Sequence, residues 1–298
     1  MENNLVKKQP AFSVVIQSDM YKKLINNTLG DPKKATRFIA SITSAVATNP
    51  ALQECEPSSI VAGALVGEAL ELSPSPVLGE YYLVPFKNSK EGVTKAQMQI
   101  GYKGYLHLAI RSGQYKDIDV FEIHEGEFKG RDKETGKFKF EFIENEAERL
   151  SKPVIGYMGY FELLNGFRKT LYISKEEMEK HANTYSKAFN LEDYKKLQAG
   201  QIPEKDLWKY SSFWYKNFDT MAFKTVLRQL ISKWGIMSIQ LQEAFTKDMA
   251  VMKDNGDYEY VDSTNGMEEV VEPSINVDTP KATEKEEEKQ DTQESFIL

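Results

Sequence analysis

The middle of the chain holds short runs with strand character that are joined in pairs by turn signals. In the clearest run, residues 94–100, Ala96, Met98 and Ile100 alternate with two glutamines. Such alternation is typical of a strand with one apolar face. Asn165-Gly166, between two later runs, is a strong hairpin signal. The predicted strand segments are residues 81–86, 94–100, 115–124, an exposed hairpin over 128–142, 154–164 and 167–173. Short turns restrict neighbouring runs to antiparallel pairing.

Apolar residues at helical spacing surround these hairpins. The predicted helices cover residues 18–29, 32–49, 57–72, 101–112, 212–234 and 239–252, and a capping box at Ser174-Lys175-Glu176-Glu177 begins another. Residues 1–16 are expected to be a loose arm, and residues 186–206 a polar, mobile loop. The order predicts an α+β fold, with N-terminal helices, a small antiparallel sheet of hairpins and long C-terminal helices.

The charge of the chain is divided unevenly. The net charge is −7, yet residues 248–298 hold 15 acidic and 4 basic side chains, and the other 247 residues hold 34 basic and 30 acidic ones. Residues 255–298 are acidic and lack apolar periodicity, which is typical of disorder. The sequence therefore predicts a core over residues 1–254 and a disordered acidic tail over 255–298. Because the acidity belongs to the tail, the net charge does not exclude a polyanionic partner for the core.

Two helical segments carry cations without acidic neighbours. Between Glu91 and Asp117 there is no acid, and Lys103, His107 and Arg111 recur every four residues on one helix face. A helix face normally mixes charge signs, because opposite charges at this spacing stabilise it. We interpret a face of cations alone as a site for phosphates.

The segment 207–242 repeats this pattern with five cations against the single acid Asp219. Lys216, Thr220, Lys224 and Arg228 form its stripe. Tyrosines lie among the cations of both segments, and interleaved aromatic and basic side chains are the composition that single-stranded nucleic acid requires. The residues predicted to contact DNA are Lys95, Gln97, Tyr102, Lys103, Tyr105, His107, Arg111, Lys209, Tyr215, Lys216, Lys224, Thr225 and Arg228. Cations of the two helices are expected to converge into one groove.

The sequence lacks the motifs of several functional classes. It has no phosphate-binding glycine loop and no dinucleotide fingerprint. Three scattered histidines and the single Cys55 predict neither a metal site nor a disulfide, and they fit a reducing cytoplasm. There is no apolar run long enough to span a membrane. We therefore expect no cofactor, no membrane association and no enzyme activity.

The chain resembles the RecT family of phage-encoded single-strand annealing proteins. The matching stretches are Gly63-Ala64-Leu65 to Leu72-Ser73-Pro74, Gly79 to Phe86, Gly101-Tyr102-Lys103-Gly104-Tyr105-Leu106 through Arg111-Ser112-Gly113, and Phe218-Asp219 with Met221 to Arg228. The resemblance implies ATP-independent annealing of single-stranded DNA in homologous recombination and assembly on DNA as a ring or helical filament. It also implies a hold on the annealed duplex, and partners such as a phage exonuclease and a host single-strand binding protein.

Two departures from the family pattern and two alternative functions accompany this resemblance. Phe223 stands where family members often have a second lysine before the threonine, and residues 186–206 form a longer stretch than usual. A passive, non-specific single-strand binder would share every charge feature described above. A metal-dependent nuclease would use Asp117 and Asp119 with Glu127-Phe128-Lys129, a common triplet pattern.

Overall fold

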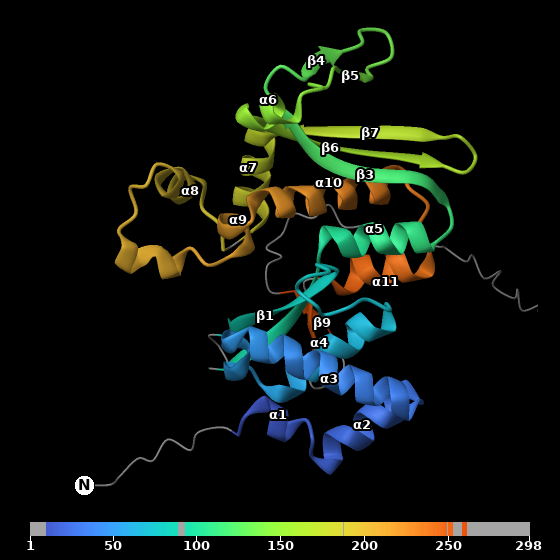
Figure 1. The fold of residues 1–298 in the computed structure, drawn as a ribbon, viewed down its shortest axis with the longest axis vertical. Helices are drawn as coiled ribbons and strands as arrows, with labels where there is room; N and C mark the ends of the chain where they lie inside the picture. The colour runs from blue at the N-terminus through green and yellow to red at the C-terminus, as the bar shows by residue number, and fades with distance from the viewer. Residues whose placement is uncertain (1–9, 89–92, 187, 249, 253–257, 261–298) are drawn as a thin grey trace, which may run out of the picture. The chain divides into compact units, whose positions relative to one another are not determined.

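The computed structural model describes residues 10–88, 93–186, 188–248, 250–252 and 258–260. These residues form helices and small antiparallel sheets, which confirms the predicted α+β class (Figure 1). No helix within the described ranges is long and apolar enough to cross a membrane.

The first part of the chain is helical. Its elements are α1 (Phe12–Val15), α2 (Asp19–Leu29), α3 (Pro32–Thr48), the 3-10 helix η1 (Pro50–Glu54) and α4 (Pro57–Ala69). Asp31 caps α3 by accepting a hydrogen bond from the backbone N of Lys33 at 2.8 Å. Phe12 and Ile16 are buried in the core. The expectation of a loose arm over residues 1–16 is therefore wrong for residues 12–16.

A hairpin of β1 (Tyr81–Asn88) and β2 (Val93–Ile100) packs on α4. The contact depends on Gly67 of α4, because a Cβ atom there would lie only 2.4 Å from the ring of Tyr81. Both strands pair in antiparallel register, with Tyr81 opposite Ile100. The predicted hairpin is confirmed, and β2 leads directly into α5 (Tyr102–Arg111).

A second sheet has the order β3-β6-β7, from β3 (Tyr115–His124), β6 (Val154–Leu163) and β7 (Arg168–Ser174). Between β3 and β6 lie the hairpin of β4 (Phe128–Arg131) and β5 (Phe138–Phe140) and the short α6 (Glu146–Ser151). The predicted capping box at Ser174 and Glu177 is confirmed and begins α7 (Lys175–Tyr185).

The long α10 (Phe218–Trp234) connects the sheet with α5. It contacts β6 and β7 on one side and α5 on the other, and Figure 1 shows it between them. The predicted helix over 212–234 is interrupted at Asn217, so that α9 (Phe213–Lys216) precedes α10 as a separate turn. Asn217 has φ −139° and ψ 54°, which is not helical.

The remaining elements correct two further expectations. The predicted loop over 186–206 contains α8 (Leu191–Gln198), which Asn190 caps, and the start of the 3-10 helix η2 (Glu204–Lys209). The predicted helix over 239–252 ends early: α11 covers Ile239–Lys247, and β8 (Ala250–Met252) follows and pairs with β9 (Tyr258–Tyr260). β9 falls at the start of the predicted tail, and residues 261–298 lie outside the described residues.

We expect Gly67→Ala to lower the free energy of unfolding by about 1–3 kcal/mol, because the new methyl group overpacks the contact with buried Tyr81. Gly63→Ala on the same helix is the matched control. Its Cβ would be close only to the end of the Leu83 side chain, at 3.1 Å, and would lie at ordinary contact distance from Met98. There, the gain in helix propensity of up to about 1 kcal/mol offsets the crowding. Urea unfolding of the three proteins measures both effects, and equal losses at both positions would contradict the packing argument.

Candidate nucleic-acid interface

The buried face of α5 and its predicted cation face are opposite one another. Gly104, Tyr105, Leu108 and Ala109 are buried, whereas Lys103 is exposed. Residues two positions apart lie on opposite sides of a helix. The predicted stripe of α5 therefore points away from the side on which Tyr105 contacts α10.

His107 and Arg111 have partners inside the fold. The Nδ1 atom of His107 lies 2.7 Å from Oε1 of Glu80. Arg111 donates to the backbone carbonyls of Leu70 at 2.5 Å and Glu71 at 3.1 Å, at the C-terminal end of α4. Arg111 also reaches Gln240 of α11 at 3.2 Å. The Arg111 guanidinium thus satisfies carbonyls that a helix end leaves unpaired, and it joins three helices.

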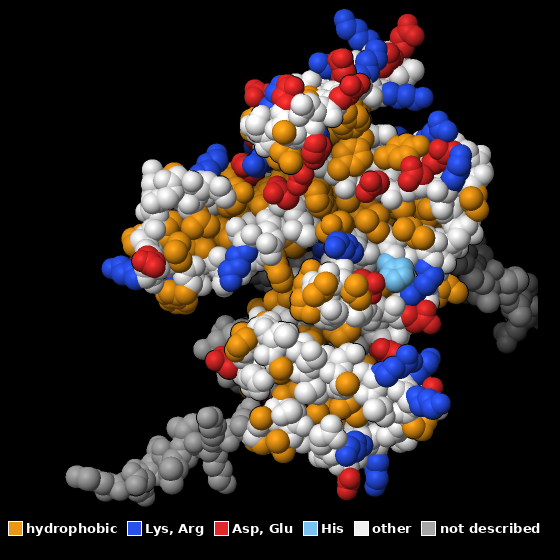
Figure 2. All heavy atoms as spheres, in the orientation of Figure 1, with side chains coloured by type: hydrophobic (Ala, Val, Ile, Leu, Met, Phe, Trp, Pro, Cys, Tyr) orange, Lys and Arg blue, Asp and Glu red, His pale blue; other side chains and the backbone are white. Residues whose placement is uncertain are grey.

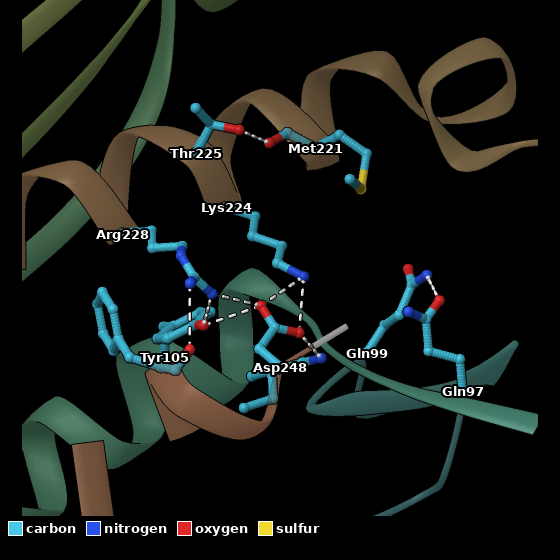
Figure 3. A network of polar contacts seen from close by, with 10 residues as sticks. Gln97, Gln99, Tyr105, Met221, Lys224, Thr225, Arg228 and Asp248 are labelled. Carbon is cyan, nitrogen blue, oxygen red and sulfur yellow. Dashed lines mark hydrogen bonds and ion pairs between the residues drawn. The ribbon is translucent and has the colours of Figure 1, made fainter. Parts of the chain in front are cut away.

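Lys224 and Arg228 converge on one buried carboxylate, that of Asp248 (Figure 3). Lys224 Nζ lies 2.8 Å from Oδ2 of Asp248, and Arg228 Nη1 lies 2.9 Å from the same oxygen. The Tyr105 hydroxyl donates to Oδ2 at 2.9 Å, and the backbone N of Ile100 donates to Oδ1 at 2.8 Å. Arg228 in turn donates to the Tyr105 hydroxyl at 2.8 Å. We call these five residues the Asp248 cluster.

The Asp248 cluster is almost completely withdrawn from solvent. Relative exposure is 2% for Asp248, 4% for Lys224 and 0% for Tyr105. Burial alone would raise the pKa of the Asp248 carboxyl, but the charges of Lys224 and Arg228 and the hydrogen bonds outweigh it and hold that pKa below its usual value. Burial raises the pKa of Tyr105, which stays a neutral donor.

These positions correct part of the predicted site. Tyr105 cannot stack on a base where it stands, because it is fully buried, and Lys224 belongs to the core rather than to a solvent-facing stripe. Gln97 is also buried and accepts a hydrogen bond from the Gln99 amide at 3.0 Å. The cations of α5 and α10 therefore do not form one open groove within the described part of the chain.

The other predicted residues differ in their burial and in their hydrogen bonds and ion pairs. Lys95 is half-buried on β2, and Thr225 donates to the backbone of Met221 at 2.9 Å. The Tyr215 hydroxyl accepts from the Asn190 backbone at 2.7 Å, and Lys209 pairs with Asp206 at 2.7 Å.

Lys103 and Lys216 are exposed, and neither forms an ion pair with another described residue. Tyr102 is half-buried, with its ring 5.3 Å from that of Phe223. Lys103, Lys216 and Tyr102 remain accessible from solvent.

Other cations on the surface lie among acids. On the face that Figure 2 shows, acidic and basic side chains are interleaved around the β4–β5 hairpin and the β3–β6–β7 sheet. Lys129 pairs with Glu141, and Lys116 and Arg168 both pair with Glu162. Such a mixed surface gives no single-sign field for a polyanion.

The residues of the nuclease alternative are also engaged. The carboxylate of Glu127 is buried and holds Arg149 at 2.7 Å, Lys129 pairs with Glu141, and Asp119 accepts from the backbone of Val120. In the described part of the chain, no group of three or more His, Cys, Asp or Glu side chains is placed to hold a metal ion.

Sequence reasoning missed Asp248, because its charge was counted with the acidic balance of residues 248–298, although the residue itself fell within the predicted helix over 239–252. One signal could have revealed an internal partner. Lys224 lies between Ala222 and Val226 of α10, and Arg228 lies between Leu227 and Leu230; these four apolar residues are all buried. Cations that share the spacing of buried apolar residues indicate a buried counter-charge.

Asp248→Ala is expected to lower the free energy of unfolding by about 3–5 kcal/mol, because it leaves buried cations without their carboxylate. Glu243→Ala, an exposed position on the same helix, should change it by less than about 0.5 kcal/mol. The folded-state pKa of Asp248 is lowered, so its contribution is present above the unfolded-state pKa of about 3.9 and is lost as pH falls through the lower folded value. The difference between wild type and Asp248→Ala should therefore shrink below about pH 4 in chemical unfolding. A difference independent of pH would contradict the ionic account.

Comparison with known proteins agrees with the resemblance inferred from the sequence. A family model described as the RecT family matches residues 36–293. The uncharacterized protein YqaK of Bacillus subtilis (strain 168) is 36% identical over 300 residues, covering 96% of this chain and 91% of that protein. Protein RecT of Escherichia coli (strain K12) is 28% identical over 251 residues, covering 82% of this chain and 81% of its own length. With a family match over most of its length and a relative above 30% identity, the chain belongs to the RecT family.

Proposed function

We propose that this protein coats single-stranded DNA without sequence preference and pairs it with a complementary strand, without nucleotide hydrolysis. Membership of the RecT family supports DNA binding, single-strand annealing and a role in DNA recombination. Proteins of this family anneal DNA rather than act as classical enzymes, and the proposal requires no covalent chemistry.

The observation that carries the proposal is Lys103, which is exposed in the first turn of α5. No side chain among the described residues caps this helix, and its first turn contains no acid. The N-terminus of a helix attracts anions, because its unpaired N–H groups and the helix dipole both favour negative charge. Lys103 adds a full positive charge at this turn, where its aliphatic part lies beside Gly79. A backbone phosphate fits this arrangement.

Aromatic rings surround the same turn. Tyr102 begins the turn and is half-buried, and the half-buried Tyr82 lies beside Gly101, which precedes the turn. The Phe213 ring of α9 lies 5.4 Å from that of Tyr82. Lys216 ends α9 and is exposed. We call Tyr82, Tyr102, Lys103, Phe213 and Lys216 the Lys103 surface. Stacking of a base on such rings contributes about 1–3 kcal/mol and tolerates any sequence.

The mechanism follows from what prevents two strands from pairing. Base pairing is favourable, with stacking near 1.4 kcal/mol per step. The obstacles are kinetic, because two phosphate backbones repel each other and single strands fold on themselves. Cations on the protein neutralise one backbone and hold it extended, with its base edges open to the second strand.

The wider setting is proposed on the family alone. The protein would act in the cytoplasm as a homo-oligomer, in a ring or helical filament, with a phage exonuclease and a host single-strand binding protein as partners. Residues 255–298 would serve as a solubilising extension of the DNA-binding core.

Mixing two complementary labelled oligonucleotides with the protein, without ATP or added metal, tests the proposal. We expect duplex to form faster than with the oligonucleotides alone. Strands that are coated but stay unpaired would instead indicate a passive binder. Fragments that appear when magnesium is added would indicate the nuclease alternative.

Lys103→Ala combined with Lys216→Ala should weaken binding to every oligonucleotide sequence alike. The slope of log affinity against log salt should become shallower by about 0.7 for each phosphate that the protein no longer neutralises. Fluorescence anisotropy over a salt series measures both quantities. Lys23→Ala, an exposed lysine on α2 outside the Lys103 surface, is the control and should leave the slope unchanged. An unchanged slope in the double variant would exclude the Lys103 surface as a phosphate site.

A further inference from the structure

We infer that the Asp248 cluster is a second binding site for the DNA backbone, and that the Asp248 carboxylate occupies the place of a phosphodiester until DNA displaces it. The inference rests on the proposed function, since it assumes that the chain binds single-stranded DNA. The Asp248 cluster differs from the Lys103 surface because it is closed in the structure. DNA can bind there only when a phosphate replaces the Asp248 carboxylate.

The donors around Asp248 are those that proteins use for phosphates. Two cationic side chains, a hydroxyl and a backbone N–H all donate to one carboxylate, at distances from 2.8 to 3.0 Å. A phosphodiester also carries one negative charge on two free oxygens, and it accepts hydrogen bonds from lysine, arginine, hydroxyl and backbone donors. The Asp248 carboxylate therefore occupies a set of donors that also suits a phosphodiester.

The donors are also held by packing that does not involve Asp248. Ile100 ends β2, Tyr105 lies in the buried face of α5, and Lys224 and Arg228 belong to α10, which packs on the β3–β6–β7 sheet. Arg228 also donates to the Phe245 carbonyl of α11 at 3.1 Å. A phosphodiester in the place of the carboxylate would supply the same charge and acceptors, and so would keep these elements together.

The anion, by contrast, stands on the short connection between α11 and β8, and its removal from the cluster is compensated when another anion takes its place. Asp248 is the first residue beyond α11, with non-helical φ −64° and ψ 130°. The strand that follows, β8, has three residues and pairs only with the three residues of β9 among the described strands. A two-stranded ribbon of this length is marginally stable by itself.

The approach to the cluster also suits a strand. β8 lies against β2, and Figure 3 shows Gln97 and Gln99 of β2 beside the Asp248 cluster. Displacement of Asp248 together with β8 would uncover β2 next to Lys224. A sugar-phosphate chain could then pass along two amide side chains, which hydrogen-bond without regard to sequence, towards the cations of α10.

Asp248→Asn tests the exchange, because it keeps the shape of the side chain and removes its charge. Binding to a labelled oligothymidylate should tighten by roughly tenfold, the range that one charge-assisted hydrogen bond represents. Because DNA contacts the same cations in both proteins once the carboxylate has left, the slope of log affinity against log salt should stay that of wild type, whereas Lys224→Gln should make it shallower by about 0.7. Glu243→Gln makes the same charge change on the exposed side of the same helix, and it should alter the affinity by less than about twofold because salt screens exposed charges. Adding Lys224→Gln to Asp248→Asn should abolish the gain.

Hydrogen exchange on the wild-type chain gives an independent decision if Asp248→Asn folds poorly. The Asp248 amide donates to the Ala244 carbonyl at 3.0 Å. Peptides covering the end of α11 should therefore exchange faster when oligothymidylate binds. Unchanged affinity in Asp248→Asn, or exchange that slows or stays constant at the end of α11, would overturn the inference. If the wild-type protein anneals DNA but these expected results are not observed, the inference is wrong and the proposed function stands. If the wild-type protein neither binds nor anneals DNA, the proposed function itself is wrong.

Discussion

The buried carboxylate of Asp248 is the group on which the arrangement of the second half of the protein depends. It receives hydrogen bonds from the end of β2, from α5 and twice from α10, and it stands directly after α11. An ionised group in a core must have its hydrogen-bonding capacity met. All of these elements must therefore meet at one point, which sets the depth and register at which α10 crosses α5.

The elements that sequence alone could predict are those whose signals are local. Asp31 before Pro32 begins a helix through its own side chain, Asn165-Gly166 closes a hairpin, and Ser174 with Glu177 forms a reciprocal cap. Each signal lies within four residues of the structure that it determines. The helix α8 was missed because it is short and polar, and because its buried Tyr194 stacks on Phe218, which is distant in sequence.

The candidate site could be predicted only in part, for the same reason. Helical spacing identified which cations share a face, and Lys103 is indeed exposed at the start of α5. Spacing does not reveal which acid arrives from elsewhere in the chain. Asp248 is twenty residues from Arg228 and lies beyond another helix, and its role became visible only in the packed structure. A cation face without local acids therefore has two physical solutions, a bound phosphate or a distant carboxylate, and the structure shows the second for Lys224 and Arg228.

Arg111 has a consequence for how binding defects in this protein are to be interpreted. Its guanidinium ties the end of α4 to α11 across α5. A neutral residue there would loosen a junction of three helices and could weaken binding without removing any contact to a ligand. A charge-to-alanine scan that scores only affinity would not distinguish this effect at Arg111 from a lost contact to a ligand. Measuring thermal unfolding on every variant of such a scan separates residues that hold the scaffold from residues that touch the ligand.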